Sequence, residues 1–254
     1  NDTKGLDNMR LTNEICKICK REFERGKINV SSAGTLLSFM EKPNFKMSFG
    51  FAQYCAEGNL CGDTIKTIND SRGHMVFIIS DGMGKGSRAA LDGAMGAGLL
   101  SKLLSAGFGF DSSLKVVNSA LLVKSHEESL ATLDCVRVDL FSGKCEFYKA
   151  GAPRSYIVKD DRLTKCELTS MPAGILRGVE FAKRTTVLNT DDEIIMMSDG
   201  VTDVGNEWLE KFLRLETTLE PNEKAKAILK IALENSDEKH RDDMSVIVAK
   251  MLER

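Results

Sequence analysis

Two aspartates in this sequence occupy matching positions, each between an apolar run and a glycine. Asp81 lies in the segment FIISDG, and Asp199 lies in the segment IMMSDG. A third acidic pair, Asp242 and Asp243, directly precedes the apolar run SVIV. Such runs are typical of buried strands, so all three places put a carboxylate at a strand end, at the rim of the core. Carboxylate oxygens are ligands that Mg²⁺ and Mn²⁺ prefer. We therefore predict a divalent-cation site formed by these aspartates.

The chemistry that such a site supports is hydrolysis at phosphorus. Two cations about 3.5–4 Å apart can share a water molecule, lower its pKa and direct it at a phosphoryl group, so that no protein nucleophile is needed. Gly82 permits a sharp turn after Asp81, which lets its carbonyl face a metal as well. The sequence has only three histidines, widely spaced, which disfavours an imidazole site. The alternative, that Asp-Gly is only a common turn after a strand, explains one copy better than two copies in matching contexts.

Other phosphate chemistry fits the sequence less well. The segment GMGKG (82–86) lacks the G-x-x-x-x-G-K-[ST] spacing of a nucleotide phosphate loop and the G-x-G-x-x-G spacing of a dinucleotide site. A phospho-acceptor receiver domain also carries acidic residues at strand ends, but it alternates strands and helices. A non-catalytic scaffold with a phosphatase fold stays open as a second hypothesis, although the principal aspartates are all present.

The elements that must position these aspartates are grouped by type rather than alternating. They are expected, in order, as a strand at 74–80, two helices within 87–122, strands from 131 to 168, a hairpin at 184–198, a helix at 222–234 and a strand at 244–251. The continuous apolar run at 74–80 suits a strand buried on both faces. This order indicates an α+β layered sandwich of antiparallel sheets with helices on the outside.

The N-terminal stretch, residues 1–57, carries none of the acidic motifs, and we predict a helical, regulatory segment before a catalytic domain at 58–254. An apolar stripe predicts a helix over about 12–25. This helix contains Cys16 and Cys19, whose C-x-x-C spacing occurs in zinc and redox sites, but a closed zinc site needs four ligands. We interpret both as small residues on a buried stripe, and all seven cysteines as reduced thiols rather than a disulfide framework.

The composition excludes some classes of partner. The chain has 254 residues, 35 of them basic and 37 acidic, and therefore lacks the basic footprint of a nucleic-acid-binding protein. No apolar stretch reaches the roughly 18–20 residues that span a membrane. This segment is thus expected to contact neither nucleic acid nor membrane. Because it begins with Asn1 and shows no signal peptide, we interpret it as a piece of a longer protein or as a processed chain, so that any membrane anchor would lie upstream. We expect the segment itself to be a cytoplasmic domain.

The acidic motifs, taken in order, resemble those of the metal-dependent (PPM-type) serine/threonine phosphatases. The three that carry this resemblance are Asp81-Gly82, Ser198-Asp199-Gly200 and Asp242-Asp243-Met244-Ser245-Val246. Further stretches resemble the bacterial branch typified by stage II sporulation protein E, namely Gly62-Asp63, ISDGMGKGSRA (79–89), ATLD (131–134) and MPAGI (171–175). The similarity runs from about residue 58 to residue 252.

This resemblance implies a four-layer αββα sandwich with a two-metal centre, occupied by Mn²⁺ or Mg²⁺, between two antiparallel sheets. The metal ligands that it implies by position are Asp63, Asp81, the carbonyl of Gly82, Asp199 and Asp242. Asp81 would bridge both metals, and the three aspartates of the principal motifs, Asp81, Asp199 and Asp242, would be catalytic. Asp63 would act directly or through water, and Asp243 stays open as an alternative to Asp242.

The resemblance also implies a substrate, which is phosphoserine or phosphothreonine on a partner protein. In this branch that partner would be an anti-sigma-factor antagonist, and its dephosphorylation would release a sporulation sigma factor. A homodimer is among the open alternatives for the oligomeric state. Many eukaryotic family members bind phosphate with an arginine before the first acidic motif, which this chain lacks near Asp63. Either Lys85 or Arg88 substitutes for it, or the substrate protein supplies the complementary charge and both residues are solvated charges at a helix start.

Overall fold

The computed structural model describes residues 8–58, 60–70, 72–84, 86–124, 130–160, 162–178, 180–205, 207–238 and 240–254. The chain consists of two compact units, Asn1–Asn44 and Phe45–Arg254. The described part of the first unit consists of helix α1 (Asn8–Cys19) and an antiparallel hairpin of β1 (Lys27–Ser31) and β2 (Gly34–Ser38). Among the described residues, no helix combines the length and apolar character that crossing a membrane requires.

Helix α1 begins and ends earlier than the helix expected over 12–25, and its own unit buries its apolar side only in part. Leu11, Ile15 and Cys16 are half-buried, whereas Ile18 is 79% exposed and Cys19 is exposed as well. Within this unit, Cys16 and Cys19 therefore do not share a buried stripe. A two-stranded hairpin offers too little surface to cover a helix face. All seven cysteines, each within the described ranges, are free thiols.

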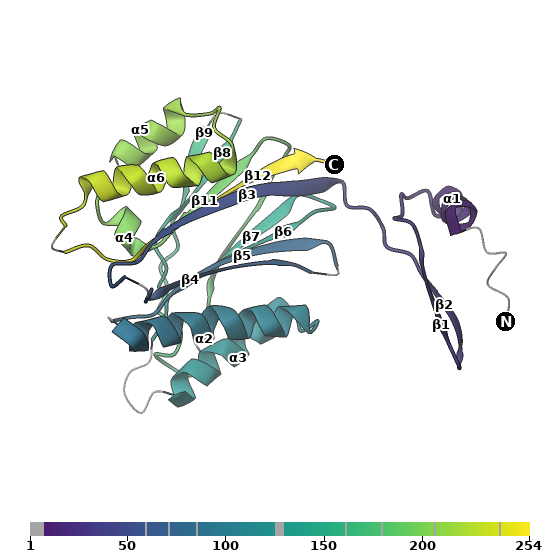
Figure 1. Ribbon diagram of the computed structural model, residues 1–254, viewed down its shortest axis with the longest axis horizontal. Helices are drawn as coiled ribbons and strands as arrows, with labels where there is room; N and C mark the ends of the chain where they lie inside the picture. Colours follow the sequence, from purple (N-terminus) through teal and green to yellow (C-terminus); the bar gives the residue numbers. More distant parts are fainter. Residues whose placement is uncertain are drawn as a thin grey trace. The chain divides into compact units, whose positions relative to one another are not determined.

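The second unit is a four-layer αββα sandwich, which confirms the expected fold class (Figure 1). One antiparallel sheet has the strand order β10-β7-β6-β5-β4, and the other has the order β3-β12-β11-β8-β9. We call these the first sheet and the second sheet. The strands are β3 (Phe45–Tyr54), β4 (Asp63–Asn69), β5 (His74–Asp81), β6 (Leu133–Asp139), β7 (Lys144–Ala150), β8 (Ser155–Lys159), β9 (Arg162–Cys166), β10 (Ala182–Val187), β11 (Glu193–Met197) and β12 (Met244–Glu253).

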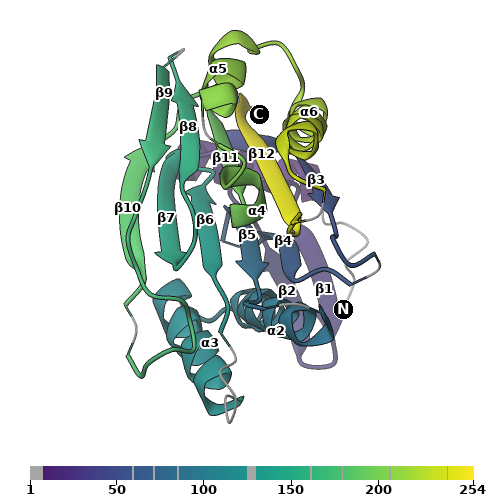
Figure 2. The same cartoon turned by 90° about the vertical axis from the view of Figure 1, so that its left-hand side faces the viewer.

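Helices cover the outer face of each sheet (Figure 2). On the first sheet these are α2 (Gly86–Ser105) and α3 (Phe110–Lys124). On the second sheet they are α5 (Glu207–Leu215) and α6 (Pro221–Asn235), with the single turn α4 (Asp199–Thr202) at the end of β11. The helix expected at 222–234 is thus confirmed, whereas α5 is an additional helix that the sequence pattern did not predict.

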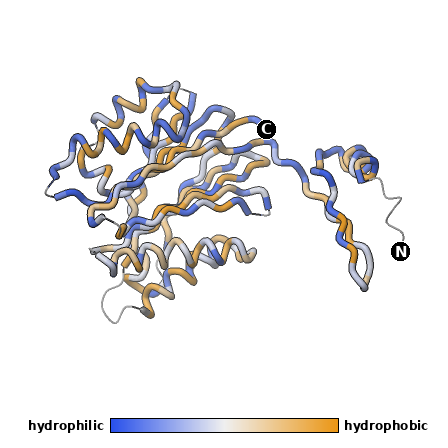
Figure 3. The backbone as a smooth tube through the Cα atoms, in the orientation of Figure 1, coloured by the Kyte–Doolittle hydropathy of each residue, from blue (hydrophilic) through white to orange (hydrophobic). Residues whose placement is uncertain are grey.

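The apolar core explains why β5 reads as a continuous apolar run. Alternate residues of β5 face opposite ways. Phe77, for example, packs between the two sheets, whereas Ile78 packs toward α2 and α3. Both are fully buried. Hydrophobic residues accordingly follow the strands through the middle layers of the sandwich (Figure 3).

One predicted hairpin does not form. The two apolar runs within 184–198 are predicted to pair across a turn at 189–192, but the structure places them in different sheets. Strand β10 pairs with β7 in the first sheet, and β11 lies between β8 and β12 in the second sheet. A short polar connection is compatible with either arrangement, so the choice rests on the distant partners β7 and β12.

The division of the chain lies one strand before the boundary expected after residue 57. Residues 45–54 form β3, which pairs with β12 along its whole length from Phe45↔Glu253 to Tyr54↔Met244. Strand β3 is therefore an integral part of the second sheet, next to the strand that follows Asp242 and Asp243.

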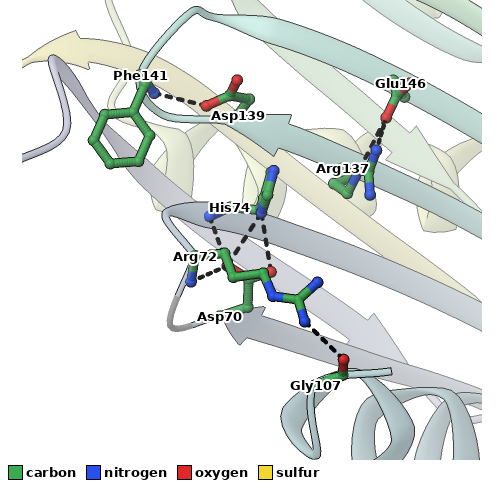
Figure 4. A network of polar contacts seen from close by, with 8 residues as sticks. All are labelled: Asp70, Arg72, His74, Gly107, Arg137, Asp139, Phe141 and Glu146. Carbon is green, nitrogen blue, oxygen red and sulfur yellow. Dashed lines mark hydrogen bonds and ion pairs between the residues drawn. The ribbon is translucent and has the colours of Figure 1, made fainter. Parts of the chain in front are cut away.

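At the His74 end of β5, a polar network satisfies its own charges (Figure 4). Asp70 Oδ1 accepts the backbone N–H groups of Arg72 (2.9 Å) and His74 (2.8 Å), and the His74 ring lies 3.0 Å from Asp70 Oδ2. The Arg72 guanidinium donates to the carbonyl of Gly107 at 2.9 Å, just after α2. Nearby, Asp139 accepts the Phe141 N–H at 2.9 Å. This network ties the β4–β5 turn to α2 at the end opposite Asp81.

Candidate metal centre

Strand pairing places Asp63 and Asp81 side by side. They are register partners at the end of the β4–β5 ladder, although the sequence analysis left the role of Asp63 open. Directly paired residues in an antiparallel sheet have Cβ atoms about 4.5–5.5 Å apart, and like charges there are destabilising. Two carboxylates in this arrangement are therefore suited to share a positive charge.

Asp199 reaches the same region from the second sheet. It is the first residue of α4, directly after β11, and Ser198 before it is extended, with φ −78° and ψ 170°. The N–H of Gly200 donates to Asp199 Oδ1 at 2.8 Å. A Cβ atom on Gly200 would lie 2.2 Å from the carbonyl oxygen of Asp243. This glycine is therefore needed so that the turn after β11 can approach the start of β12.

Gly82 has a packing role that the sequence analysis did not anticipate. A Cβ atom at this position would lie 1.9 Å from the carbonyl oxygen of Ala89 and 2.8 Å from the N of Gly93. The first turns of α2 thus pack directly on the backbone that follows Asp81. Gly93 is equally constrained, since its Cβ would lie 2.2 Å from the carbonyl oxygen of Gly62. Glycines at these two positions let α2 approach the Asp63–Asp81 pair closely.

The two neighbouring aspartates of the third motif have different surroundings. The carboxylate of Asp243 accepts the backbone N–H groups of Ala56 (2.7 Å) and Gly62. It thereby holds the loop that leads into Asp63. Asp242 is exposed, and its Oδ1 accepts the N–H of Asp243 at 2.8 Å. Asp243 therefore holds backbone, and both aspartates line the adjacent cavity.

The electrostatics show that these carboxylates act on one another. Burial, followed by the charges of Asp199, Asp63, Asp242 and Asp243, raises the pKa of Asp81 to about 8. Burial also raises the pKa of Asp199, with Asp242 as the next contribution. In the absence of cations, the cluster therefore resists full ionisation.

Asp63 is the most deeply buried member of this cluster. Burial raises its pKa to about 6; the hydroxyls of Ser198 and Ser245 oppose the rise, and Asp199 and Asp243 add to it. Both carboxylate oxygens are buried, and neither has a hydrogen-bond partner of regular geometry among the described residues. Within the described ranges, no three His, Cys, Asp or Glu side chains converge tightly enough to form a ready-made metal site.

A cavity of about 180 Å³ adjoins Asp242 and Asp243, and its lining includes a positively charged side chain that the sequence did not single out. Arg241 lines it together with Asp242, Gly84 and Gly86. The Arg241 side chain donates to Ser236 Oγ and to the carbonyl of Leu233, both at 2.8 Å, which fixes it beside the end of α6. The sequence feature that could have pointed to Arg241 is the run Arg-Asp-Asp, in which an arginine precedes the third acidic motif rather than the first.

The two cations proposed from the sequence have different outcomes. Arg88 lies on the exposed side of the first turn of α2. Lys85 falls outside the described residues. Arg88 is not among the described residues that line the cavity, whereas Arg241 is, so Arg241 is better placed than Arg88 for contact with a phosphate group.

Comparison with known proteins identifies the family. The profile of the stage II sporulation protein E (SpoIIE) family matches residues 71–252. Stage II sporulation protein E of Bacillus subtilis (strain 168) is 28% identical over 222 residues, which is 85% of this chain and 27% of that protein. The Priestia megaterium protein is 31% identical over 200 residues, 76% of this chain and 34% of that protein. The chain thus spans about a quarter to a third of the length of these relatives.

Solved structures agree with the fold. A B. subtilis SpoIIE structure, comprising the PP2C phosphatase domain and a fragment of the regulatory domain, superposes with a TM-score of 0.80 at 25% identity. It covers 98% of this chain and 75% of that one. The catalytic domain of the serine/threonine phosphatase PstP, solved with two manganese ions, has a TM-score of 0.66 at 18% identity and covers 82% of this chain and 100% of that one, which shows a shared fold alone. The chain therefore belongs to the stage II sporulation protein E family and carries a PP2C-type protein serine/threonine phosphatase domain.

Proposed function

We propose that this domain hydrolyses phosphoserine or phosphothreonine on a partner protein with a water molecule activated by two divalent cations. The observation that carries the proposal is a cluster of aspartates from both sheets, in which burial and then the neighbouring carboxylate charges raise the pKa values of Asp63, Asp81 and Asp199. Repulsion between these carboxylates lowers the stability of the folded chain when no cation is bound. A cation between the carboxylates would convert the repulsion into binding.

The residues at this position fit Mn²⁺ or Mg²⁺. The donors are all oxygens, as hard cations prefer, and the unpartnered buried oxygens of Asp63 need a positive partner. The residues proposed to hold the two cations are Asp63, Asp81, the carbonyl of Gly82, Asp199 and Asp242. Bound cations would lower the pKa of a shared water and stabilise charge on the phosphoryl oxygens.

The remaining residues position these ligands and the substrate. Asp243 holds the loop before Asp63 through the N–H groups of Ala56 and Gly62. Arg241, fixed by its bonds to Ser236 and Leu233, offers a positive charge at the cavity where a phosphate group would enter. A cavity of about 180 Å³ is far too small for a folded partner, which would rest on the surrounding surface.

The partner proposed is a phosphorylated anti-sigma-factor antagonist, whose dephosphorylation would release a sporulation sigma factor. Family membership supports this choice. One structural neighbour is a Mycobacterium tuberculosis protein described by its RsbU and RsbW domains. We also propose that the domain works in the cytoplasm as part of a longer, membrane-anchored protein, and a homodimer is one form it could take.

The test is hydrolysis of p-nitrophenyl phosphate with Mn²⁺ and with EDTA, followed by dephosphorylation of the antagonist encoded by the same genome. We expect activity with Mn²⁺ and none in chelator. Full activity in EDTA would contradict the proposed mechanism. The alternative, a non-catalytic scaffold, predicts that the chain binds the phosphorylated antagonist and leaves it phosphorylated in either condition.

A further inference from the structure

A fully buried lysine connects the two sheets beside the carboxylate cluster. Lys149, on β7, has a relative exposure of 0%. Its ammonium group donates to Asp134 Oδ2 (2.7 Å), the carbonyl of Pro153 (2.6 Å) and Ser155 Oγ (2.8 Å). The Ser155 hydroxyl in turn donates to Asp134 Oδ2 at 2.9 Å. All three ammonium hydrogens therefore have acceptors. We call these four residues the lysine clamp.

The clamp spans the layer between the sheets. Lys149 and Asp134 belong to β7 and β6 of the first sheet, whereas Ser155 begins β8 of the second sheet and Pro153 lies just before it. A buried ion pair is weak support for stability, because desolvation offsets the attraction between its charges. Its directional bonds nevertheless fix how the two sheets sit against each other at this point.

One side of the clamp leads directly to Asp81. Asp134 is the register partner of Ile79, two residues before Asp81. Thr132, two residues before Asp134, exchanges hydrogen bonds with Asp81. The Thr132 N–H donates to the Asp81 carbonyl at 2.8 Å, and the Asp81 N–H donates to Thr132 Oγ1 at 3.3 Å. The strand that Lys149 holds is thus the one that holds the backbone of Asp81.

The other side of the clamp leads to Asp199. Strand β8 pairs with β11 through Tyr156↔Ile195, and Asp199 follows the end of β11. Across the carboxylates, Gln53 makes a second polar connection between the sheets, because its side-chain N–H group donates to the Asp63 carbonyl (3.0 Å) and to Ser245 Oγ (3.1 Å). The strand orders place the carboxylates between Gln53 and the lysine clamp.

We propose that Lys149 is a positioning residue for the metal centre, which sets the separation of Asp81 and Asp199 by joining their sheets. This inference rests on the proposed function, since it assumes that both aspartates bind cations. Lys149 touches neither the substrate nor the carboxylates of the cluster in this arrangement. Its effect passes through β6 on one side and through β8 and β11 on the other.

A second buried lysine provides a matched control. Lys224, on α6, is 1% exposed and donates to Glu193 Oε2 at 2.6 Å. This pair joins α6 to the start of β11, the end remote from Asp199, and it does not cross between the sheets. The two pairs are alike in burial and bond length, and they differ in the layers that they connect.

The test uses double variants that remove both charges of a pair. Lys149→Met alone would leave Asp134 buried without its partner and lower stability for that reason. Lys149→Met with Asp134→Asn leaves the net charge unchanged and removes the uncompensated carboxylate. The control is Lys224→Met with Glu193→Gln. Each full chain is stripped with EDTA, its unfolding by urea is measured, and Mn²⁺ binding is then titrated by calorimetry.

We expect the Lys149 double variant to bind Mn²⁺ roughly tenfold more weakly, in the range found when residues that orient metal ligands are removed. The Lys224 double variant should bind like the natural chain, even where both variants lose similar stability. Two outcomes would overturn the inference: a Mn²⁺ titration of the Lys149 double variant that overlays that of the natural chain, or equal weakening in both double variants. If the natural chain itself binds no Mn²⁺, the proposed function fails, and the inference fails with it.

Discussion

The two ends of β5 hold their carboxylates in opposite environments. At the His74 end, Asp70 accepts two backbone N–H groups and contacts a histidine ring, and Asp139 accepts the Phe141 N–H (Figure 4). At the other end, Asp81 faces Asp63 directly across the ladder. The carboxylates at the His74 end accept hydrogen bonds from other groups of the protein, whereas those at the Asp81 end face further negative charges.

This contrast separates what stabilises the fold from what serves binding. Hydrogen bonds to buried or half-buried carboxylates add to the free energy of unfolding and do not depend on a bound cation. Carboxylates that repel one another reduce stability until a cation arrives, and their repulsion then becomes part of the binding free energy. Substitution of a carboxylate should therefore lower turnover without lowering stability at the Asp81 end, and lower stability without changing turnover at the His74 end.

The largest expected effect is at the acidic end. Asp81→Asn or Asp199→Asn should lower kcat by about 10³-fold or more, comparable to the loss of a principal electrostatic group. The free energy of unfolding in EDTA should stay equal or rise, because one repelling charge is removed. Steady-state kinetics with Mn²⁺ and urea unfolding in EDTA measure the two quantities. Near-natural turnover in either variant would remove that residue from the proposed ligands.

The same experiment at the other end should invert the pattern. Asp70→Ala removes the acceptor of two backbone N–H groups, and we expect the free energy of unfolding to fall by about 1–2 kcal/mol. Turnover per folded molecule and the Mn²⁺ titration should match those of the natural chain. A variant with unchanged stability and altered Mn²⁺ affinity would show that the two ends are not independent.

The pH dependence of stability should sharpen the comparison. The folded-state pKa values of Asp63 and Asp81 are raised to about 6 and about 8, above the ordinary value of 3.8. Between about pH 4 and pH 8 the folded chain thus holds more protons than the unfolded chain. These two groups therefore make stability fall as the pH rises through that window.

We expect this fall in EDTA and its reversal by Mn²⁺, which competes with protons for the same oxygens. Urea unfolding at pH 5 and at pH 8 measures it, with Asp81→Asn as the variant in which the fall is smaller. If the metal-free natural chain and Asp81→Asn share the same pH dependence, Asp81 does not carry the raised pKa.

The smallest expected effect concerns the N-terminal unit, which we predict to be regulatory. Deletion of residues 1–44 removes that unit and leaves β3 complete. The shortened chain should stay folded, and its apparent Mn²⁺ affinity or basal turnover should change at least several-fold, because the helices after Asp81 are packed through glycines and a small shift there would move a ligand. Overlaying titration curves for the folded, shortened chain and the natural chain would end the regulatory interpretation.

Local pattern was enough to locate the principal aspartates. Asp81 and Asp199 each end an apolar run before a glycine, and the structure places both at strand ends, as the pattern predicts. The sandwich class also followed from local signals, because helices and strands are grouped along the chain. These features depend on residues that are close together along the chain, so short sequence patterns predict them.

Partner choice was where the prediction failed. The run at 184–198 contains two good strands, and their polar connection looked like a hairpin, yet β10 and β11 join different sheets. The apolar stripe of α1 was expected to be buried, and Ile18 is exposed. In both cases the local pattern names an element correctly but says nothing about the surface that it meets.

The order of residues alone predicts aspartates at the strand ends, at the rim of the core, because an aspartate next to an apolar run is a local pattern. That Asp63 faces Asp81, that Asp243 holds the loop beside Asp242 and that Lys149 joins the sheets became visible only in the folded chain. These contacts join residues that are far apart along the chain. Gln53 bonds Ser245 across 192 positions, and contacts of that kind arise from the packing of whole sheets rather than from any local propensity.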